Sequence, residues 1–175
     1  QAAEVPAGSG GVLFLPYLTG GMNDILDASG CFLNMTMDTD QAVLWRAVLE
    51  AIGYDYMEIT DLYRAAGIDL SRITITEGGS RDELWNQMKA DMLGSRTITL
   101  ENAAGAVMTN CLFGAYAVGN VSDIREALTD NLHIKKVCEP DSENHAFYRR
   151  QYEKKNRLVK TELAQAFRTL KEMRE

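Results

Sequence analysis

Two short apolar runs stand at the start of the chain. Residues 11–18 and 30–36 are rich in Leu and Phe, and each run begins at a glycine. Runs of this length and composition predict buried strands. The segment between them, residues 19–29, is polar and predicts a loop.

A helix is predicted after the acidic residues Asp38 and Asp40. We interpret both as N-caps rather than as a catalytic carboxylate pair, because side-chain oxygens at that position accept from the free N–H groups of the first turn. The helix is predicted to end at Gly67. Its apolar residues recur at intervals of four or seven: Leu44, Val48, Ile52, Ile59 and Tyr63.

Beyond Gly67 the pattern alternates between strand and helix. Strands are predicted at 73–76 and 97–100, with an edge strand at 134–138. Helices are predicted at 81–93 before Gly94, at 103–118 before Gly119, from Ser122 to 128, and along the tail from 142 to 174. The tail carries Tyr148, Tyr152, Val159, Leu163 and Leu170 on one side. This alternation predicts one α/β lobe, a mixed sheet with packed helices and a long C-terminal helix.

Charge narrows the class of partner. The chain has 18 basic and 25 acidic residues, a formal net charge of −7 and a pI near 4.9. Nucleic acids are bound through clustered Lys and Arg, so no nucleic-acid partner is predicted. No apolar run approaches the roughly 20 residues of a membrane span, so no membrane partner is predicted either.

The cysteines predict neither zinc nor a disulfide framework. Cys31, Cys111 and Cys138 are widely spaced, and only His133 and His145 are available beside them. We interpret the cysteines as reduced core residues of a cytoplasmic protein and predict no metal ligands. The chain opens on Gln without a leader pattern, and we expect a piece of a longer protein.

The most informative stretch is the turn at Gly78 and Gly79. A strand that turns through two glycines directly into a helix leaves bare backbone and free N–H groups beside a helix N-terminus, where a phosphate can approach. A plain tight turn is the alternative reading of the same pattern. The P-loop and dinucleotide-binding patterns are absent from the chain.

The surrounding residues resemble the C-terminal lobe of the FGGY carbohydrate kinases, in which Thr-Gly-Gly-Gly-Ala-Lys-Ser precedes Leu-Trp-x-Gln. Further blocks agree in order: residues 14–20 read Phe-Leu-Pro-Tyr-Leu-Thr-Gly, residues 46–52 resemble the Arg-Ala-x-x-Glu-Gly-Ile helix, and Pro140 with its following tyrosines resembles the closing block. Within the family, residues 14–20 resemble the xylulokinase-like branch. The residues that match around the turn are Thr76, Gly78, Gly79, Ser80, Arg81, Leu84, Trp85, Gln87, Ala90, Asp91 and Gly94.

The resemblance implies an actin-like, ribonuclease-H-like ATPase lobe, with residues 1–175 as the nucleotide-contacting C-terminal domain and the N-terminal sugar-binding lobe absent. It implies ATP and Mg as cofactors, a small sugar as substrate, and the protein's own N-terminal lobe as partner. Carried over by position, Gly78, Gly79 and Ser80 lie beside the phosphates or ribose, and Asp82 reaches toward adenine. The catalytic Asp of the family lies upstream, so no catalytic residue is expected here and the isolated chain is expected to be inactive.

Some positions depart from the family pattern. Glu77 stands at the family's first glycine, residues 20–23 replace a Gly-Glu-Arg-Thr segment, and Thr109 and Asn110 replace Gly-Ala. These departures support a second hypothesis, a non-catalytic sugar-binding or regulatory homologue. A third is an interaction module whose tail helix docks a partner. The choice of sugar and a homodimer are left open.

The remaining side chains are interpreted as structural. Trp45 and Trp85 are expected to pack, and His133 and His145 to lie on the surface. Four methionines are expected to fill the core: Met35, Met37, Met88 and Met92. The basic residues of the tail are expected to form a solvated face: Arg149, Arg150, Lys154, Lys155, Arg157 and Lys160.

Overall fold

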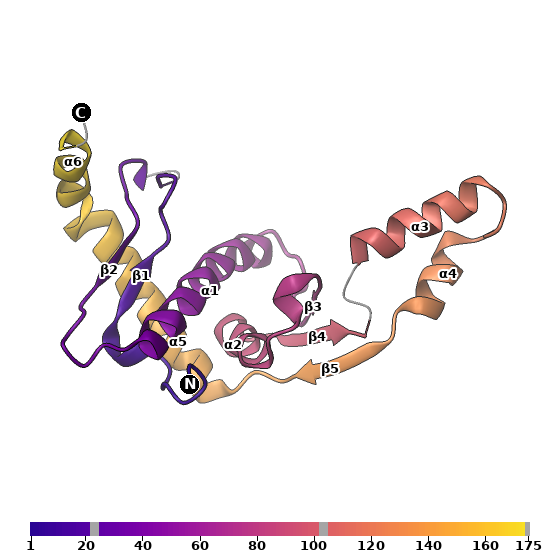
Figure 1. Ribbon diagram of the computed structural model, residues 1–175, viewed down its shortest axis with the longest axis horizontal. Helices are drawn as coiled ribbons and strands as arrows, with labels where there is room; N and C mark the ends of the chain where they lie inside the picture. Colours follow the sequence, from indigo (N-terminus) through magenta and orange to yellow (C-terminus); the bar gives the residue numbers. More distant parts are fainter. Residues whose placement is uncertain (22–24, 102–104, 174–175) are drawn as a thin grey trace.

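A computed structural model describes residues 1–21, 25–101 and 105–173 (Figure 1). The N-terminal half comprises η1 (Ser9–Gly11), β1 (Leu13–Leu15), β2 (Cys31–Leu33), α1 (Gln41–Ala65), β3 (Arg72–Ile75), η3 (Gly78–Ser80) and α2 (Glu83–Leu93). The C-terminal half comprises β4 (Arg96–Leu100), α3 (Gly105–Ala117), α4 (Ile124–Asn131), β5 (Ile134–Cys138), α5 (Ser142–Arg157), η4 (Leu158–Glu162) and α6 (Ala164–Glu172). The predicted alternation of strands and helices is confirmed.

The strands form two small sheets. The two apolar runs pair as an antiparallel hairpin of β1 and β2, with Phe14 opposite Phe32. Within these strands the predicted burial is correct only for Leu15, because the other residues of both strands are half-buried. In the second sheet β4 lies in the middle, parallel to β3 and antiparallel to β5. The predicted edge strand at 134–138 is therefore confirmed, and the second sheet is mixed.

The predicted helix caps are confirmed in part. The Oδ1 atom of Asp40 accepts from the N–H of Val43, at 2.9 Å, and begins α1. The cap predicted at Asp38 is wrong, because that residue precedes the helix in an exposed turn. The cap predicted at Ser122 is also wrong, because α4 begins one residue later with Asp123 as its acceptor.

The buried face of α1 differs from the predicted stripe. Leu49, Tyr54 and Met57 are buried, whereas Ile59 and Tyr63 are 46% and 49% exposed. The face is chosen by close contact with α2, since a Cβ atom at Gly53 would lie 2.2 Å from the sulfur of Met92. Helix α1 can approach α2 this closely only where its own surface is bare backbone.

The core has two parts. The first joins α1, α2 and α5 through Tyr54, Met57, Met92, Leu93, Tyr148 and Tyr152. The second holds the hairpin against the tail through Leu15, Ala28, Val159 and Phe167. The tail is not one regular helix as predicted, because a wider π-helical turn, η4, separates α5 from α6. Leu170 is 46% exposed and does not join the predicted apolar side.

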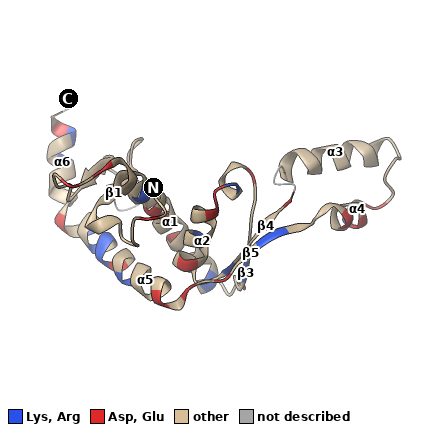
Figure 2. Ribbon diagram, turned by 60° about the horizontal axis from the view of Figure 1, so that its bottom comes forward, with Lys and Arg blue, Asp and Glu red and all other residues tan. Residues whose placement is uncertain are grey.

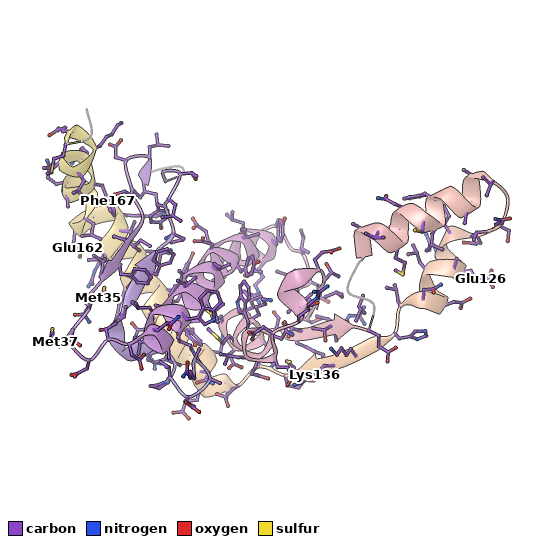
Figure 3. The ribbon with its side chains drawn as sticks, viewed as in Figure 1. Met35, Met37, Glu126, Lys136, Glu162 and Phe167 are labelled. Atoms are coloured by element: carbon purple, nitrogen blue, oxygen red, sulfur yellow. The ribbon has the colours of Figure 1, made fainter. Side chains whose placement is uncertain are left out.

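Other packing predictions were right only in part. Met88 and Met92 are buried, but Met35 and Met37 lie exposed near the hairpin (Figure 3). Trp45 is also exposed, so its predicted packing role is wrong. The cysteines were predicted to be core residues, but Cys111 is exposed. The basic tail residues were predicted to be solvated, but Lys155 is buried. His145 is half-buried, with Nδ1 2.9 Å from the carbonyl oxygen of Asp91.

A buried carboxylate joins three segments of the chain. Glu50 of α1 is 3% exposed and accepts hydrogen bonds from the N–H of Gly8 at 2.8 Å, the hydroxyl of Ser9 at 2.8 Å and the hydroxyl of Tyr148 at 3.0 Å. Arg46, one turn earlier, pairs with it at 3.2 Å and donates to the Tyr148 oxygen at 3.0 Å. Burial, together with the nearby Glu50 charge, raises the pKa of Tyr148. These groups satisfy one another's hydrogen-bonding capacity.

Helices α3 and α4 form an arm that extends from the end of β4 and β5, away from α1, α2 and α5 (Figure 1). None of their described residues is buried. Helix α3 carries no charged residue, as its uniform tan colour shows in Figure 2. Its exposed side chains include Val107, Phe113 and Tyr116.

We expect Glu50→Ala to lower the free energy of unfolding by about 3–5 kcal/mol, because the buried Arg46 charge loses its partner and three donors lose their acceptor. Urea denaturation followed by circular dichroism measures this change. Glu50→Gln should cost less, since its amide oxygen still accepts.

The matched control is Glu153→Ala on the exposed side of α5, expected to change stability by no more than about 0.5 kcal/mol. Equal losses at both positions would show that Glu50 does not hold the segments together.

Candidate functional site

The predicted glycine turn lies between the end of β3 at Ile75 and the start of α2 at Glu83. Gly78, Gly79 and Ser80 form one tight helical turn, closed by hydrogen bonds from Ser80 N–H to the Glu77 carbonyl and from Arg81 N–H to the Gly78 carbonyl. The hydroxyl of Ser80 also donates to the Glu77 carbonyl, at 2.7 Å. The turn therefore has a defined shape before any ligand binds.

Two side chains of α2 fix the carbonyls of this turn. Asn86 Nδ2 donates to the Ser80 carbonyl at 2.7 Å, and Lys89 Nζ donates to the Gly79 carbonyl at 2.8 Å. With these carbonyls held toward α2, no acceptor for the N–H groups of Gly78 and Gly79 is found within the described ranges. Free N–H groups ahead of a helix form a favourable environment for an anion.

Neither glycine is required by the fold itself. Gly78 and Gly79 are not in the left-handed region of backbone conformation that favours glycine. A Cβ atom at Gly78 would meet nothing within 4 Å, and one at Gly79 would meet only Lys89 Nζ, at 3.6 Å. The space beside Gly78 is therefore open, and a bound group could use it.

Asp82 begins α2 as its N-cap. Its Oδ1 atom accepts from the N–H of Trp85 at 2.8 Å, and the residue is exposed. With Trp45 and Leu84 it lines a shallow pocket of about 400 Å³ beside the N-terminal residues. Its predicted contact with adenine remains a prediction.

Glu77 has the backbone of a glycine position. Its φ of 60° and ψ of −158° lie in a region that is almost confined to glycine, so the side chain imposes strain. The carboxylate points to the start of α3, where Oε1 accepts from the N–H of Ala106 at 3.2 Å. It thus contacts α3 rather than the Gly78 and Gly79 N–H groups.

Lys89 was missed by the sequence analysis. It is 4% exposed, and its ammonium lies 4.2 Å from the centre of the Trp85 ring. Burial lowers the pKa of Lys89 to about 8, and the charge of Asp82 opposes this shift. The only signal in the sequence was its spacing of four from Trp85, which places both on one helix face.

The other positions singled out from the sequence lie apart from the turn or outside the described residues. Met22 and Asn23 of the altered loop are outside the described residues, as is Ala103 at the predicted start of α3. Thr109 bonds back to the Gly105 carbonyl within α3, at 2.8 Å, and Asn110 is exposed. Within the described ranges no group of three or more His, Cys, Asp or Glu could hold a metal ion. Over the same ranges, no helix is long and apolar enough to cross a bilayer.

The fold and the turn define the class of protein. A xylulose kinase structure from Rhodospirillum rubrum superimposes with a TM-score of 0.74 at 29% identity, over 95% of this chain and 33% of that one. The lobe accordingly has the actin-like, ribonuclease-H-like ATPase fold, with a mixed sheet and packed helices as predicted.

The sequence comparisons identify the family. Residues 1–118 match the FGGY family of carbohydrate kinases, C-terminal domain. Xylulose kinase of Staphylococcus epidermidis is 31% identical over 153 residues, 86% of this chain and 31% of that protein. Gluconokinase of Bacillus subtilis is 33% identical over 132 residues, 74% of this chain and 26% of that protein. The chain belongs to the FGGY family of carbohydrate kinases, and it spans about a third or less of the length of these relatives.

We expect Glu77→Gly to be more stable than Glu77→Ala by about 1 kcal/mol, because glycine relieves the strained backbone and alanine keeps it. Thermal denaturation of the two variants measures the difference. At Glu153, in the middle of α5, the same two substitutions should rank in the opposite order, since glycine weakens a helix interior. The same order at both positions would mean that Glu77 is not strained.

Proposed function

We propose that residues 1–175 form the nucleotide-contacting C-terminal domain of an ATP-dependent carbohydrate kinase whose substrate is a xylulose-like pentulose. The intact protein would transfer the γ-phosphoryl group of ATP to a sugar hydroxyl with Mg²⁺. Xylulose kinases among the relatives and the Phe14–Leu18 block support this substrate class.

The observation that carries the proposal is the bare backbone of Gly78 and Gly79. The fold does not need glycine at either position, yet both side chains are missing at a turn whose two N–H groups have no acceptor among the described residues. A phosphate or ribose could approach this backbone closely, where any larger side chain would stand in the way.

Each residue of the turn then has a role in binding. The N–H groups of Gly78 and Gly79 would donate to nucleotide oxygens, with Ser80 beside them and Asp82 on the adenine side. ATP would supply the phosphoryl group, and Mg²⁺ would arrive with the phosphates, since phosphates carry much of magnesium coordination in kinases. No residue of this chain is proposed as a metal ligand.

The sugar site and the general base are proposed to lie in the protein's own N-terminal lobe. Activation of a sugar hydroxyl requires a carboxylate within hydrogen-bond distance of it, and we place no such residue in this chain. The uncharged, exposed surface of α3 supports a lobe partner, because apolar surface of that kind is normally covered. The relatives are about three times as long, which provides chain for such a lobe.

Glu77 favours a second candidate function, a non-catalytic sugar-binding or regulatory homologue. A carboxylate at the family's first glycine position adds negative charge beside a polyphosphate site, which disfavours binding. Its contact with Ala106 directs it toward α3, and this contact supports the kinase proposal over the regulatory one.

We expect calorimetric titration to show binding of Mg-ATP and Mg-ADP to this chain, weakened at least about tenfold in Gly78→Trp by steric exclusion. The control is Gly114→Trp on α3, where a Cβ atom also meets nothing within 4 Å. Unchanged binding by Gly78→Trp would contradict placement at the turn. Binding only by Glu77→Gly would favour the regulatory homologue. If neither the chain nor Glu77→Gly binds, the same titration of the protein that includes the N-terminal lobe decides whether nucleotide binds.

We also expect the chain alone to release no ADP from ATP when it is mixed with xylulose or other pentuloses, because the general base lies elsewhere. A coupled ADP assay measures this. The protein with its N-terminal lobe should show pentulose-dependent ADP release, and its absence over a pentulose panel despite sugar binding would support the regulatory homologue. Turnover by the chain alone would refute the proposed division of the site.

A further inference from the structure

Lys89 is the one charged side chain that the glycine turn covers within the described ranges. It is 4% exposed, and a Cβ atom at Gly79 would lie 3.6 Å from its Nζ. A buried ammonium costs free energy unless it is paired or bonded. Here a carbonyl and an aromatic face take the place of a carboxylate. Lys89 Nζ lies 2.8 Å from the Gly79 carbonyl oxygen and 4.2 Å from the centre of the Trp85 ring.

The charged groups on neighbouring elements are engaged elsewhere. Lys136 of β5 pairs with Glu83 at 2.9 Å, and Arg64 of α1 donates to the Leu93 carbonyl and to Ser95. Asp91 of α2 accepts from Gln87 and from the start of α5. Asp82 is the charged group whose field acts on Lys89, and it forms no ion pair with it within the described part of the chain. Among the residues that the structure describes, the positive charge beneath the turn therefore has no carboxylate partner.

We propose that Lys89 is a positioning residue of the glycine turn: its ammonium holds the Gly79 carbonyl inward, keeps the Gly78 and Gly79 N–H groups outward, and supplies the positive charge that an anionic ligand meets there. The ligand class is a nucleotide polyphosphate, so this inference rests on the proposed function. Nothing in the family pattern around Trp85 required a lysine at this position.

This role differs from simple packing on Trp85. Methionine at position 89 could pack on the indole as well as the lysine stem does, but it would leave the Gly79 carbonyl without a donor. Arginine would keep the charge and the donors and remove titration in this pH range. The two variants therefore separate packing from positioning.

The first test needs no nucleotide. Carbon-detected NMR follows the Gly79 carbonyl of the chain between pH 6.5 and 9.5. We expect the wild-type signal to move with a midpoint near pH 8, as Lys89 loses its proton. Lys89→Met should displace the signal and abolish this midpoint, and Lys89→Arg should abolish the midpoint alone. The control Lys154→Met, on the exposed side of α5, should leave the curve unchanged. A Gly79 signal that is unaffected by Lys89→Met would overturn the proposal.

The second test measures Mg-ADP affinity at pH 7.5 and 9.5. Wild type should bind about tenfold more weakly at the higher pH, Lys89→Arg should bind equally at both, and Lys89→Met should bind weakly at both. Unfolding does not account for this loss, because a lysine with a lowered pKa adds stability as the pH rises from about 8 toward 10.5. Equal affinity of wild type and Lys89→Met at both pH values would refute the role in binding. No binding by the wild type would count against nucleotide binding by the chain, while the carbonyl titration would still decide the role of Lys89.

Discussion

The Glu50 carboxylate is the constraint on which the arrangement of this lobe depends. It is a charge on the inner face of α1, and it is tolerated because Arg46, Tyr148, Ser9 and Gly8 all donate to it or to one another. These donors come from the N-terminal loop, α1 and α5, which are distant in sequence. A buried charge that needs all of its partners admits one relative placement of the segments that carry them.

Helix α2 transmits that placement to the glycine turn. It packs on α1 where Gly53 admits Met92, and its Asp91 accepts from Gln87, from the Asp141 N–H and from Asn144 at the start of α5. The same helix provides Asn86 and Lys89, which donate to the carbonyls of Ser80 and Gly79. The candidate site is therefore built on a rigid helix that the core fixes, and its bare N–H groups are a consequence of where the carbonyls are held.

Sequence reasoning succeeded where one short segment contains the whole signal. Alternating apolar runs with glycine punctuation located the strands, and Gly94 and Asp40 marked helix ends, because these features depend on neighbours within a few residues. It failed where the answer depended on a distant contact. Helix α1 has apolar residues on its exposed side as well as on its buried side. Met35 and Met37 are of a residue type common in cores, but they are exposed. The tail contains a π-helical turn that no residue pattern predicted.

The sequence by itself determined the family, the α/β class and the location of the glycine turn, since ordered motifs and local periodicity survive without any three-dimensional information. Only the tertiary structure decided that Glu77 points to α3 and that Lys89 lies beneath Gly79. It also decided that neither Gly78 nor Gly79 is needed by the fold. Burial and the direction of a side chain depend on which surfaces of helices and strands pack together. Local sequence patterns do not specify that packing, so only the tertiary structure decides it.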